Sequence, residues 1–377
     1  MLRHICAVFG LLAAAACGEA PAPVASTYFE EGNPPLLSDW GQLIVDGGAL
    51  TLGENVSPYD LNTALFTDYA HKLRTIWMPD GASAAYREND VFDFPVGSVI
   101  TKTFYYPLPD DGAADEVARN DNGGALFEGG RYLPLKSVRL IETRILVRRQ
   151  SGWAVIPYQW NEEQTDAAVH RIGDIIPLTL VSADGAKNPF KYVMPDVNQC
   201  ASCHAPDSNT RALSPIGPKA RHLNRDFAYA DGVQNQITHL YQIGYLNDAP
   251  DAAAAPKNAA WSDAGASVTE RARAYLDINC SHCHSPTGPA DTSGLFLEPD
   301  TTGTHLGICK LPIAAGAGTG DRIWGIRPGQ PEDSILVYRM DNTQPDQMMP
   351  EIGRSTIHEE GVALVADWIS TLEGDCG

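Results

Sequence analysis

The chain has 377 residues and a formal net charge of −20, from 47 acidic and 27 basic side chains. This length predicts two or three domains with enough material to bury a core. The acidic excess argues against nucleic acid and against an anionic membrane surface as partners. It fits docking to basic patches on another protein, although a solvated acidic surface explains the charge equally well.

The N-terminus has the pattern of an export signal. Arg3 precedes an apolar run over 5–16 that is too short to span a bilayer as a mature helix. Small residues then lead directly to Cys17, as in a bacterial lipobox, although alanine stands where leucine is usual. We expect a signal peptide over 1–17, lipidation of Cys17 and export to the periplasmic side, with ordinary cleavage nearby as the alternative. Gly18, in place of aspartate, favours an anchor in the outer membrane, and this anchor is the only membrane contact expected.

A Pro-rich stretch over 18–40 predicts an extended linker, and the pattern changes after it. From 41 to 185, short alternating apolar runs are separated by Gly, Pro and Asp. The clearest strand candidates are 99–106, 138–148, 153–160 and 175–181. This spacing predicts a β-rich domain built as an antiparallel β-sandwich or partial barrel. Within the second candidate, Glu142 and Arg144 alternate with apolar residues and therefore lie on the opposite, polar face.

Two short motifs indicate the chemistry. CASCH at 200–204 and CSHCH at 280–284 each place two thiols three residues apart, followed at once by histidine. The residues concerned are Cys200, Cys203, His204, Cys280, Cys283 and His284. This is the attachment pattern of c-type haem, in which each thiol adds across one vinyl group and the histidine becomes the proximal iron ligand. We therefore predict two covalently bound haem c groups. Two CxxC pairs also suit zinc, but the histidine after each pair and the exported chain favour haem.

The first haem segment, 186–259, is short for a complete cytochrome domain. No methionine lies between His204 and the second motif, so the usual downstream thioether is missing. His222, in a predicted loop, and Met194, upstream, are the nearby candidates for the sixth iron ligand, and an open or distantly ligated iron is the alternative. A helix is predicted over 227–244, where glycine ends it.

The second haem segment, 260–377, has the element order of a class I cytochrome c. A capping box at 267–270 predicts a helix that leads into the second motif, and another at 356–359 predicts a terminal helix. Between them lies a Met-Met-Pro sequence. Met349, directly before proline, is the predicted sixth ligand of the second haem, and Met348 is the alternative.

Besides Cys17, two cysteines outside the motifs remain in the mature chain, Cys309 and Cys376. They form an even pair in an oxidising compartment, so we expect a disulfide between them. Such a bond would tie the C-terminus to the middle of the second haem segment.

Five further segments stand out: LFTDYA at 65–70, FPVGS at 94–98, ETR at 142–144, YQWNEEQTD at 158–166 and GPADTSGL at 288–295. Together with the two haem motifs, they resemble a family of exported bacterial dihaem c-type cytochromes with a β-rich N-terminal region. The resemblance covers nearly the whole mature chain. It implies haem binding and electron transfer, and it does not indicate a substrate.

These features predict an α+β multidomain chain, with the β-rich domain followed by two mostly α-helical haem c segments. The predicted function is electron transfer between a redox protein partner, such as a dehydrogenase or a respiratory oxidoreductase, and a respiratory acceptor. A peroxidase-like enzyme with an open first haem is the alternative, suggested by the missing methionine and opposed by the lack of a clear distal acid–base pair. In a third interpretation the β-rich domain is a docking module, and the haems act as a sensor or conduit.

Overall fold

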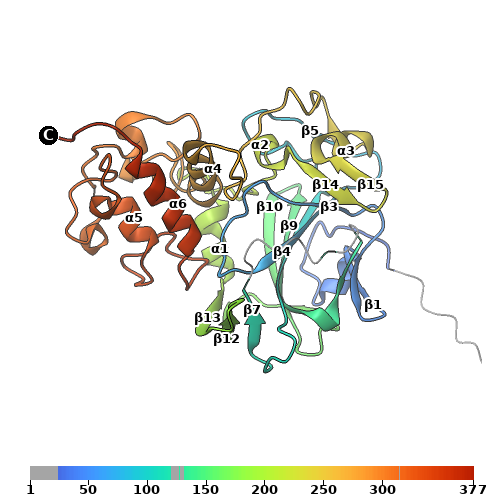
Figure 1. The fold of residues 1–377 in the computed structure, drawn as a ribbon. Coiled ribbons are helices and arrows are strands. Elements are labelled where there is room, and N and C mark those ends of the chain that lie inside the picture. Colours follow the sequence, from blue (N-terminus) through green and yellow to red (C-terminus); the bar gives the residue numbers. More distant parts are fainter. Residues whose placement is uncertain (1–23, 120–126, 128–130, 314) are drawn as a thin grey trace, which may run out of the picture.

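The computed structural model describes residues 24–119, 127, 131–313 and 315–377. Its fold is mixed α and β, with sheets in the N-terminal part and helices gathered in the C-terminal part (Figure 1). The predicted signal peptide and Cys17 lie outside the described residues. Among the helices that are described, none is both long and apolar enough to cross a membrane.

The strands of the first half are β1 (Leu43–Asp46), β2 (Ala49–Leu52), β3 (Ser57–Tyr59), β4 (His71–Trp77), β5 (Ala84–Ala85), β6 (Val99–Pro107), β7 (Glu116–Ala118), β8 (Tyr132–Pro134), β9 (Val138–Arg149) and β10 (Gly152–Trp160). The remaining strands are β11 (Ala167–Val169), β12 (Asp174–Val181), β13 (Lys187–Met194), β14 (Asp226–Tyr229), β15 (Gly232–Asn235) and β16 (Leu246–Asn247). The α-helices are α1 (Val197–His204), α2 (Ala220–Leu223), α3 (Gln236–Gln242), α4 (Val268–Cys280), α5 (Ile335–Met340) and α6 (Glu359–Ser370).

The centre of the β-rich part is a six-stranded sheet in the order β11-β10-β9-β6-β4-β3, with antiparallel pairing throughout. The four strands predicted from alternation correspond to β6, β9, β10 and β12, and all four are confirmed. Their β-branched and aromatic residues suit a pleated surface that packs on neighbouring layers. Both faces of this sheet are covered, which explains why many of its polar residues are buried.

One face of the six-stranded sheet packs against the small sheet β1-β2-β8. Leu43, Leu50 and Leu133 of the small sheet share a buried cluster with Val99 and Ile145 of the large one. The result is a pair of packed antiparallel layers, and none of the sheets that the structure describes closes into a barrel. The structure therefore supports the predicted antiparallel layering and gives it as stacked sheets.

The opposite face is covered at its two ends by different hydrophobic clusters. At one end, Ile100 and Leu146 pack with Leu223 of α2 and Leu240 of α3. At the other end, Phe104 and Ile141 pack with the hairpin β12–β13, among other residues. Polar and charged residues of the sheet lie between these two clusters.

The extended linker predicted over 18–40 differs from the structure in its described part. Leu37 and Trp40 are buried in the core of the β-rich part. Arg149 Nε donates to the carbonyl oxygen of Phe29 at 2.9 Å, and the Phe29 ring packs edge-on against Trp40 at 5.1 Å. Aromatic residues in this stretch bury apolar area on the sheet, and this burial outweighs the extended tendency of the prolines.

The predicted domain boundary at 185/186 falls in the turn of the β12–β13 hairpin, where Ser182 N donates to Ala186 O at 2.9 Å. The helix predicted over 227–244 is wrong in its first half, because β14 and β15 form a hairpin there and only α3 is helical. Ala230 and Asp231 form the turn, and Gly232, which starts β15, has a φ of 140°, which favours glycine.

The C-terminal part is built around the crossing of α4 and α6 (Figure 1). Gly361 allows this close approach, because a Cβ at that position would lie 2.4 Å from the Tyr275 hydroxyl. The capping box of Ser267 and Glu270 is present as predicted. The capping box predicted at 356–359 is wrong. Helix α6 starts at Glu359, and Thr356 Oγ1 donates to the distant Asp68 carboxylate at 2.8 Å instead of capping the helix.

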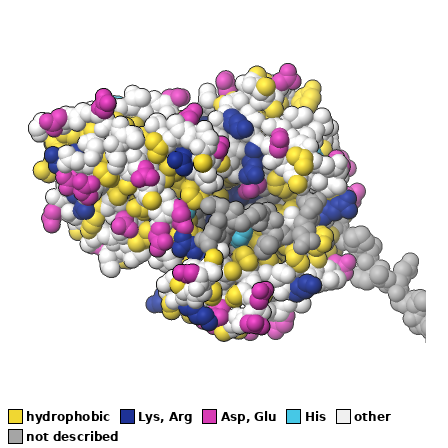
Figure 2. Space-filling view, viewed as in Figure 1, with side chains coloured by type: hydrophobic (Ala, Val, Ile, Leu, Met, Phe, Trp, Pro, Cys, Tyr) yellow, Lys and Arg dark blue, Asp and Glu magenta, His cyan; other side chains and the backbone are white. Residues whose placement is uncertain are grey.

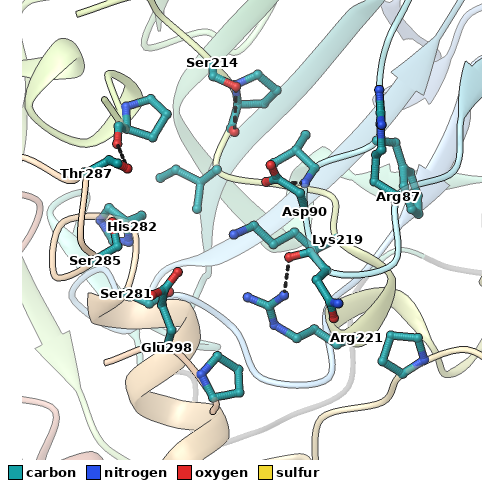
Figure 3. A pocket seen from close by; sticks show the side chains of 18 of the residues that line it. Arg87, Asp90, Ser214, Lys219, Arg221, Ser281, His282, Ser285, Thr287 and Glu298 are labelled. Carbon is teal, nitrogen blue, oxygen red and sulfur yellow. Dashed lines mark hydrogen bonds between the residues drawn. The ribbon is translucent and has the colours of Figure 1, made fainter. Parts of the chain in front are cut away.

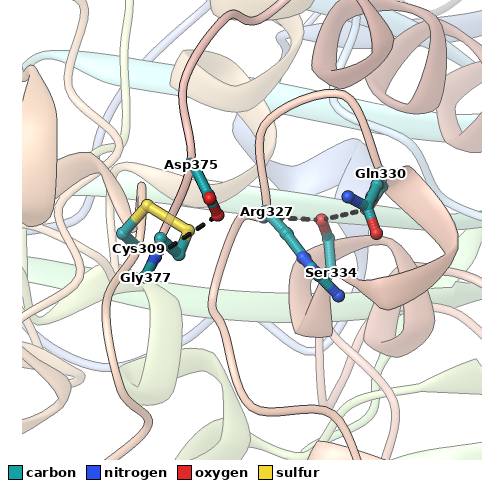
Figure 4. The surroundings of a disulfide bond; sticks show 7 residues. Cys309, Arg327, Gln330, Ser334, Asp375 and Gly377 are labelled. Carbon is teal, nitrogen blue, oxygen red and sulfur yellow. Dashed lines mark hydrogen bonds between the residues drawn. A yellow bond between two sulfur atoms is a disulfide. The ribbon is translucent and has the colours of Figure 1, made fainter.

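The structure joins Cys309 and Cys376 in a disulfide, which is the pairing expected from the sequence (Figure 4). The bond lies near a turn in which Ser334 Oγ donates to Gln330 O at 2.9 Å. On the surface, Figure 2 shows Asp and Glu side chains spread over both parts of one face, next to smaller groups of Lys and Arg. The negative charge visible on this face is therefore distributed over both parts.

Candidate functional site

Helix α1 carries the first motif at its C-terminal end. The helix begins after Asp196, whose carboxylate accepts from the backbone N–H groups of Asn198 and Gln199 at 2.7 and 2.8 Å. His204 is the last helical residue, and its Nδ1 lies 3.0 Å from the carbonyl oxygen of Ser214. Because a carbonyl can only accept, the proton is on Nδ1, and the lone pair is left on Nε2.

Helix α4 carries the second motif. Cys280 is its last residue, and the chain then turns so that His284 N donates to Cys280 O at 2.9 Å. The Nδ1 atom of His284 lies 3.3 Å from the carbonyl oxygen of Leu295, while Leu297 N donates to His284 O at 2.8 Å. The second histidine therefore has the same orientation device as the first, and its Nε2 also keeps its lone pair.

Burial keeps both motif histidines neutral. It lowers the pKa of His204 and of His284 to about 4 each, well below the ordinary value. Neutral imidazole with Nδ1 bound to a backbone carbonyl is the form in which histidine ligates iron through Nε2. The four motif cysteines are not in disulfides, whereas the Cys309–Cys376 pair is. Thiols and imidazoles are thus available together in each motif.

The two motifs lie against each other, although they are far apart in the sequence. The Sγ atoms of Cys203 and Cys283 and a ring nitrogen of His282 all lie within 4.8 Å of one another. Ser208 N donates to Thr287 O at 2.8 Å and ties the loops that follow the motifs. The Cys283 thiol lies 3.5 Å from the carbonyl oxygen of Ser202, and its closeness to Cys203 lowers the pKa of the Cys203 thiol below the ordinary value.

The three-donor cluster differs from a structural zinc site. Structural zinc sites in proteins have four protein ligands in a tetrahedron. The cluster takes only one thiol from each CxxC pair, and among the described residues Cys200 and Cys280 lie outside it. The arrangement therefore does not bring the four thiols of the two pairs into one set.

A cavity of about 1230 Å³ opens beside the motifs, and Cys203 and His282 are among the residues that line it. Figure 3 shows His282 beside Ser281 and Ser285 in this lining. This volume exceeds the range of about 300–1,000 Å³ that is usual for small-molecule sites, so a macrocycle has room here. Lys219 reaches into the cavity, and Arg87 lies at its rim in the same view. Ser214, whose carbonyl orients the first motif histidine, also lines it. Of the four thiols and two histidines predicted to hold the haems, only Cys203 lines this cavity. The cavity therefore adjoins the first motif, and the free thiols and oriented imidazoles are the groups that would hold a haem.

The structure places the two candidates for the sixth ligand of the first haem in other interactions. His222 is buried, and its Nε2 lies 2.7 Å from Oδ2 of Asp277 on α4. Its Nδ1 has no hydrogen-bond partner among the described residues. Met194 is buried in the cluster of Leu178 and Tyr192. Which residue completes the first haem iron stays a prediction.

Met349 lies in the loop between α5 and α6, where Met349 N donates to Arg339 O at 2.9 Å. The loop is organised by Arg354, a buried residue that the sequence reasoning missed. Its Nη2 donates to the carbonyl oxygens of Met349 and Asn342, both at 2.8 Å. Met348 is 4 % exposed and packs in the interior, while Met349 is more open. The choice of Met349 or Met348 as an iron ligand stays a prediction.

The sequence reasoning also missed the charged residues beneath the first motif. The polar face of β9 is covered, with Glu142 fully buried and accepting from the Tyr192 hydroxyl at 2.7 Å. An alternating strand gives no local signal for this, because its polar face has the same sequence pattern whether water or another layer covers it.

Comparisons with family models, with curated proteins and with solved structures found no match.

Proposed function

We propose that this chain is an exported c-type cytochrome with two covalent haems, which carries electrons between a redox protein and a respiratory acceptor. The single observation that supports it best is the matched geometry of the two motif histidines. His204 and His284 each direct Nδ1 to a backbone carbonyl, ten and eleven residues further along the chain. Two separate segments that share this device, each with two free thiols, have the arrangement that covalent haem requires.

In this proposal the four motif cysteines would hold the haems through thioether bonds, and His204 and His284 would each bind an iron through Nε2. A haem iron carries one electron by changing between its ferrous and ferric states. The Ser214 and Leu295 carbonyls fix the planes of the imidazoles and raise their basicity. Met349 supplies the soft sixth ligand of the second haem, which favours the ferrous state and a higher potential.

The contact between the two motifs supports electron transfer within the chain. The Cys203 and Cys283 sulfurs lie within 4.8 Å, and each would be bonded to the edge of its own macrocycle. Two centres attached this close exchange electrons without a protein relay. An electron entering at one haem would therefore reach the other inside the same molecule.

A dihaem enzyme with an open first haem is the second candidate, and one observation favours it. His222 is engaged by Asp277 at 2.7 Å and Met194 by the cluster under β13, so neither is free to bind iron as the structure stands. An iron without a sixth protein ligand can bind peroxide or another small molecule. In that case the second haem would feed electrons to the first.

Export and a lipid anchor at Cys17 are part of the proposal, since c-type haem is attached outside the cytoplasm. The redox partner would be a protein such as a dehydrogenase or a respiratory oxidoreductase, and the anchor would hold the chain at the outer membrane. A Cys17→Ser variant should then move from the membrane fraction to the soluble periplasmic fraction. Unchanged fractionation would count against the anchor alone.

The decisive experiment is optical spectroscopy of the purified exported protein in its oxidised, reduced and carbon monoxide-treated reduced states. A pyridine haemochrome assay should count two haems per chain. Variants with both motif cysteines changed to serine, made in one motif at a time, should each lose one haem. If carbon monoxide binds neither haem, both irons are six-coordinate and the carrier function is supported. If it binds one, the enzyme is favoured, and a protein without covalent haem would refute both.

A further inference from the structure

Three cations stand side by side across the middle of the six-stranded sheet. Arg74 of β4 is in register with Lys102 of β6, and Lys102 is in register with Arg144 of β9. Residues in register on neighbouring strands project from the same face, so the three side chains form one row. We call this set the basic row. Like charges directly opposite each other destabilise a sheet, which makes such a row unfavourable unless an anion compensates it.

The next row of the same face adds another lysine, whose pKa is lowered well below the ordinary value by burial and by its basic neighbours. Lys72 lies opposite Phe104, two residues along from the basic row. The Phe104 ring is contacted by three cationic groups, with Lys102 Nζ at 4.9 Å, Arg144 Cζ at 4.4 Å and Lys72 Nζ at 5.9 Å from its centre. The ring face offsets part of this positive charge.

The nearby carboxylates balance these cations only in part. Asp60 accepts from Arg74 Nη1 at 3.0 Å but is shared with Arg225 at 3.3 Å. Glu142 pairs with Arg144 alone, accepting from its Nε at 2.8 Å and also from its Nη2. Lys102 has no carboxylate partner among the described residues. The positive surplus is local and lies in a chain whose net charge is −20.

One atom of the basic row is left without a partner in the interior. Arg74 is 4 % exposed, and its Nη2 has no hydrogen-bond partner among the described residues. A buried guanidinium nitrogen with an unused donor is costly, so this donor points to a ligand group. Burial and the neighbouring Arg74 and Arg144 also lower the pKa of Lys102 to about 7, as expected for a cation that lacks its anion.

The basic row faces the first motif. The positive charges of Lys102 and Arg144 both act on His204, and Arg144 acts on Cys200. Helix α1 follows directly from β13, which is fixed to this face by the Tyr192–Glu142 hydrogen bond at 2.7 Å. The row therefore lies in the polar gap of the sheet face, beneath the segment that would carry the first haem.

We propose that Arg74, Lys102 and Arg144 form a binding site for a carboxylate group beside the first CxxCH motif. Guanidinium and ammonium groups on one face are the donors that a carboxylate requires, with charge-assisted hydrogen bonds. The carboxylate has two possible sources. The first is a propionate of the haem held by Cys200 and Cys203, and this source rests on the proposed function. The second is a free small carboxylate, and this source does not depend on the proposed function.

The test uses the full exported protein with Lys102→Gln, with Lys102→Arg as the charge-conserving variant. Lys191→Gln is the matched control, because it removes the same charge from an exposed position on β13. The first measurement is the resonance Raman band of haem propionate bending. The second is calorimetric titration with acetate, which also works on a chain that carries no haem and so separates this proposal from the proposed function.

A propionate ligand predicts a shift of the Raman band in Lys102→Gln, but not in Lys102→Arg or Lys191→Gln. A free carboxylate predicts saturable acetate binding that weakens roughly tenfold or more in Lys102→Gln and stays unchanged in the control. If the Raman band and the acetate affinity are the same in Lys102→Gln, Lys102→Arg, Lys191→Gln and the wild type, the proposal is overturned. Absence of haem with acetate binding intact would refute the proposed function and leave this site standing.

Discussion

The carboxylate of Asp277 joins the two parts of the chain that carry the motifs, so its removal is the most informative single change. Asp277 is 1 % exposed on α4, three residues before Cys280. It accepts from Arg221 Nε at 2.6 Å and from His222 Nε2 at 2.7 Å, both on α2. Asn258 Nδ2 also donates to it at 2.8 Å. Burial alone would raise the pKa of Asp277, but these donors hold it well below the ordinary value.

An Asp277→Asn change would keep the size of the side chain and remove its charge. The buried Arg221 guanidinium would lose its counter-charge, and the amide N–H groups of the new asparagine would face the donors of Arg221, His222 and Asn258. Breaking a buried ion pair in this way costs about 3–5 kcal/mol of unfolding free energy. A surface pair should cost far less, about 0–1 kcal/mol. Asp333→Asn is the matched control, because Asp333 is 48 % exposed and pairs with Arg327 at 2.7 Å.

The assay is urea denaturation followed by far-ultraviolet circular dichroism, for the wild type and both variants between about pH 5 and pH 8. Because the folded-state pKa of Asp277 is depressed, its stabilisation is present above the unfolded pKa of about 3.9 and is lost only as pH falls through the folded value. The difference between wild type and Asp277→Asn should therefore stay constant over this range. A loss below about 1 kcal/mol, equal to that of Asp333→Asn, would show that the buried network does not hold the two parts together.

Burial lowers the pKa of His71 to about 4. As pH falls below about 6.5, His71 is therefore protonated in the unfolded chain but stays neutral in the folded chain, and the free energy of unfolding decreases. His71→Phe should remove up to about 3 kcal/mol of acid destabilisation between pH 7 and 4, and a variant as acid-sensitive as the wild type in denaturation curves would contradict this. Cys309→Ser opens a disulfide that spans 67 residues and should cost about 4 kcal/mol, measured in the same assay against wild type; a loss near zero would refute the stabilising role. Met349→Ala should lower the potential of the second haem and abolish the sulfur-to-iron charge-transfer band. Met348→Ala should reduce stability and leave the band intact, and the reverse outcome would exchange their roles.

Features with a local physical cause could be predicted from the sequence. The strands β6, β9, β10 and β12 follow from alternation over a few residues, because side chains of a strand point to opposite faces. The start of α4 follows from the capping box of Ser267 and Glu270, which are near neighbours along the chain. The spacing within the two CxxCH motifs is equally local, since it reflects the vinyl positions of one macrocycle.

The tertiary structure alone decided the features that join distant residues. Thr356 has the sequence pattern of a helix cap, yet its hydroxyl donates to Asp68 of the β-rich part, and α6 starts at Glu359. His222 looked like a free ligand until Asp277 was placed beside it. The contact of the motifs and the burial of Arg74 in the basic row have the same origin. Tertiary packing determines which polar face is covered and which distant donor and acceptor form a hydrogen bond. Neither outcome can be predicted from a short stretch of sequence.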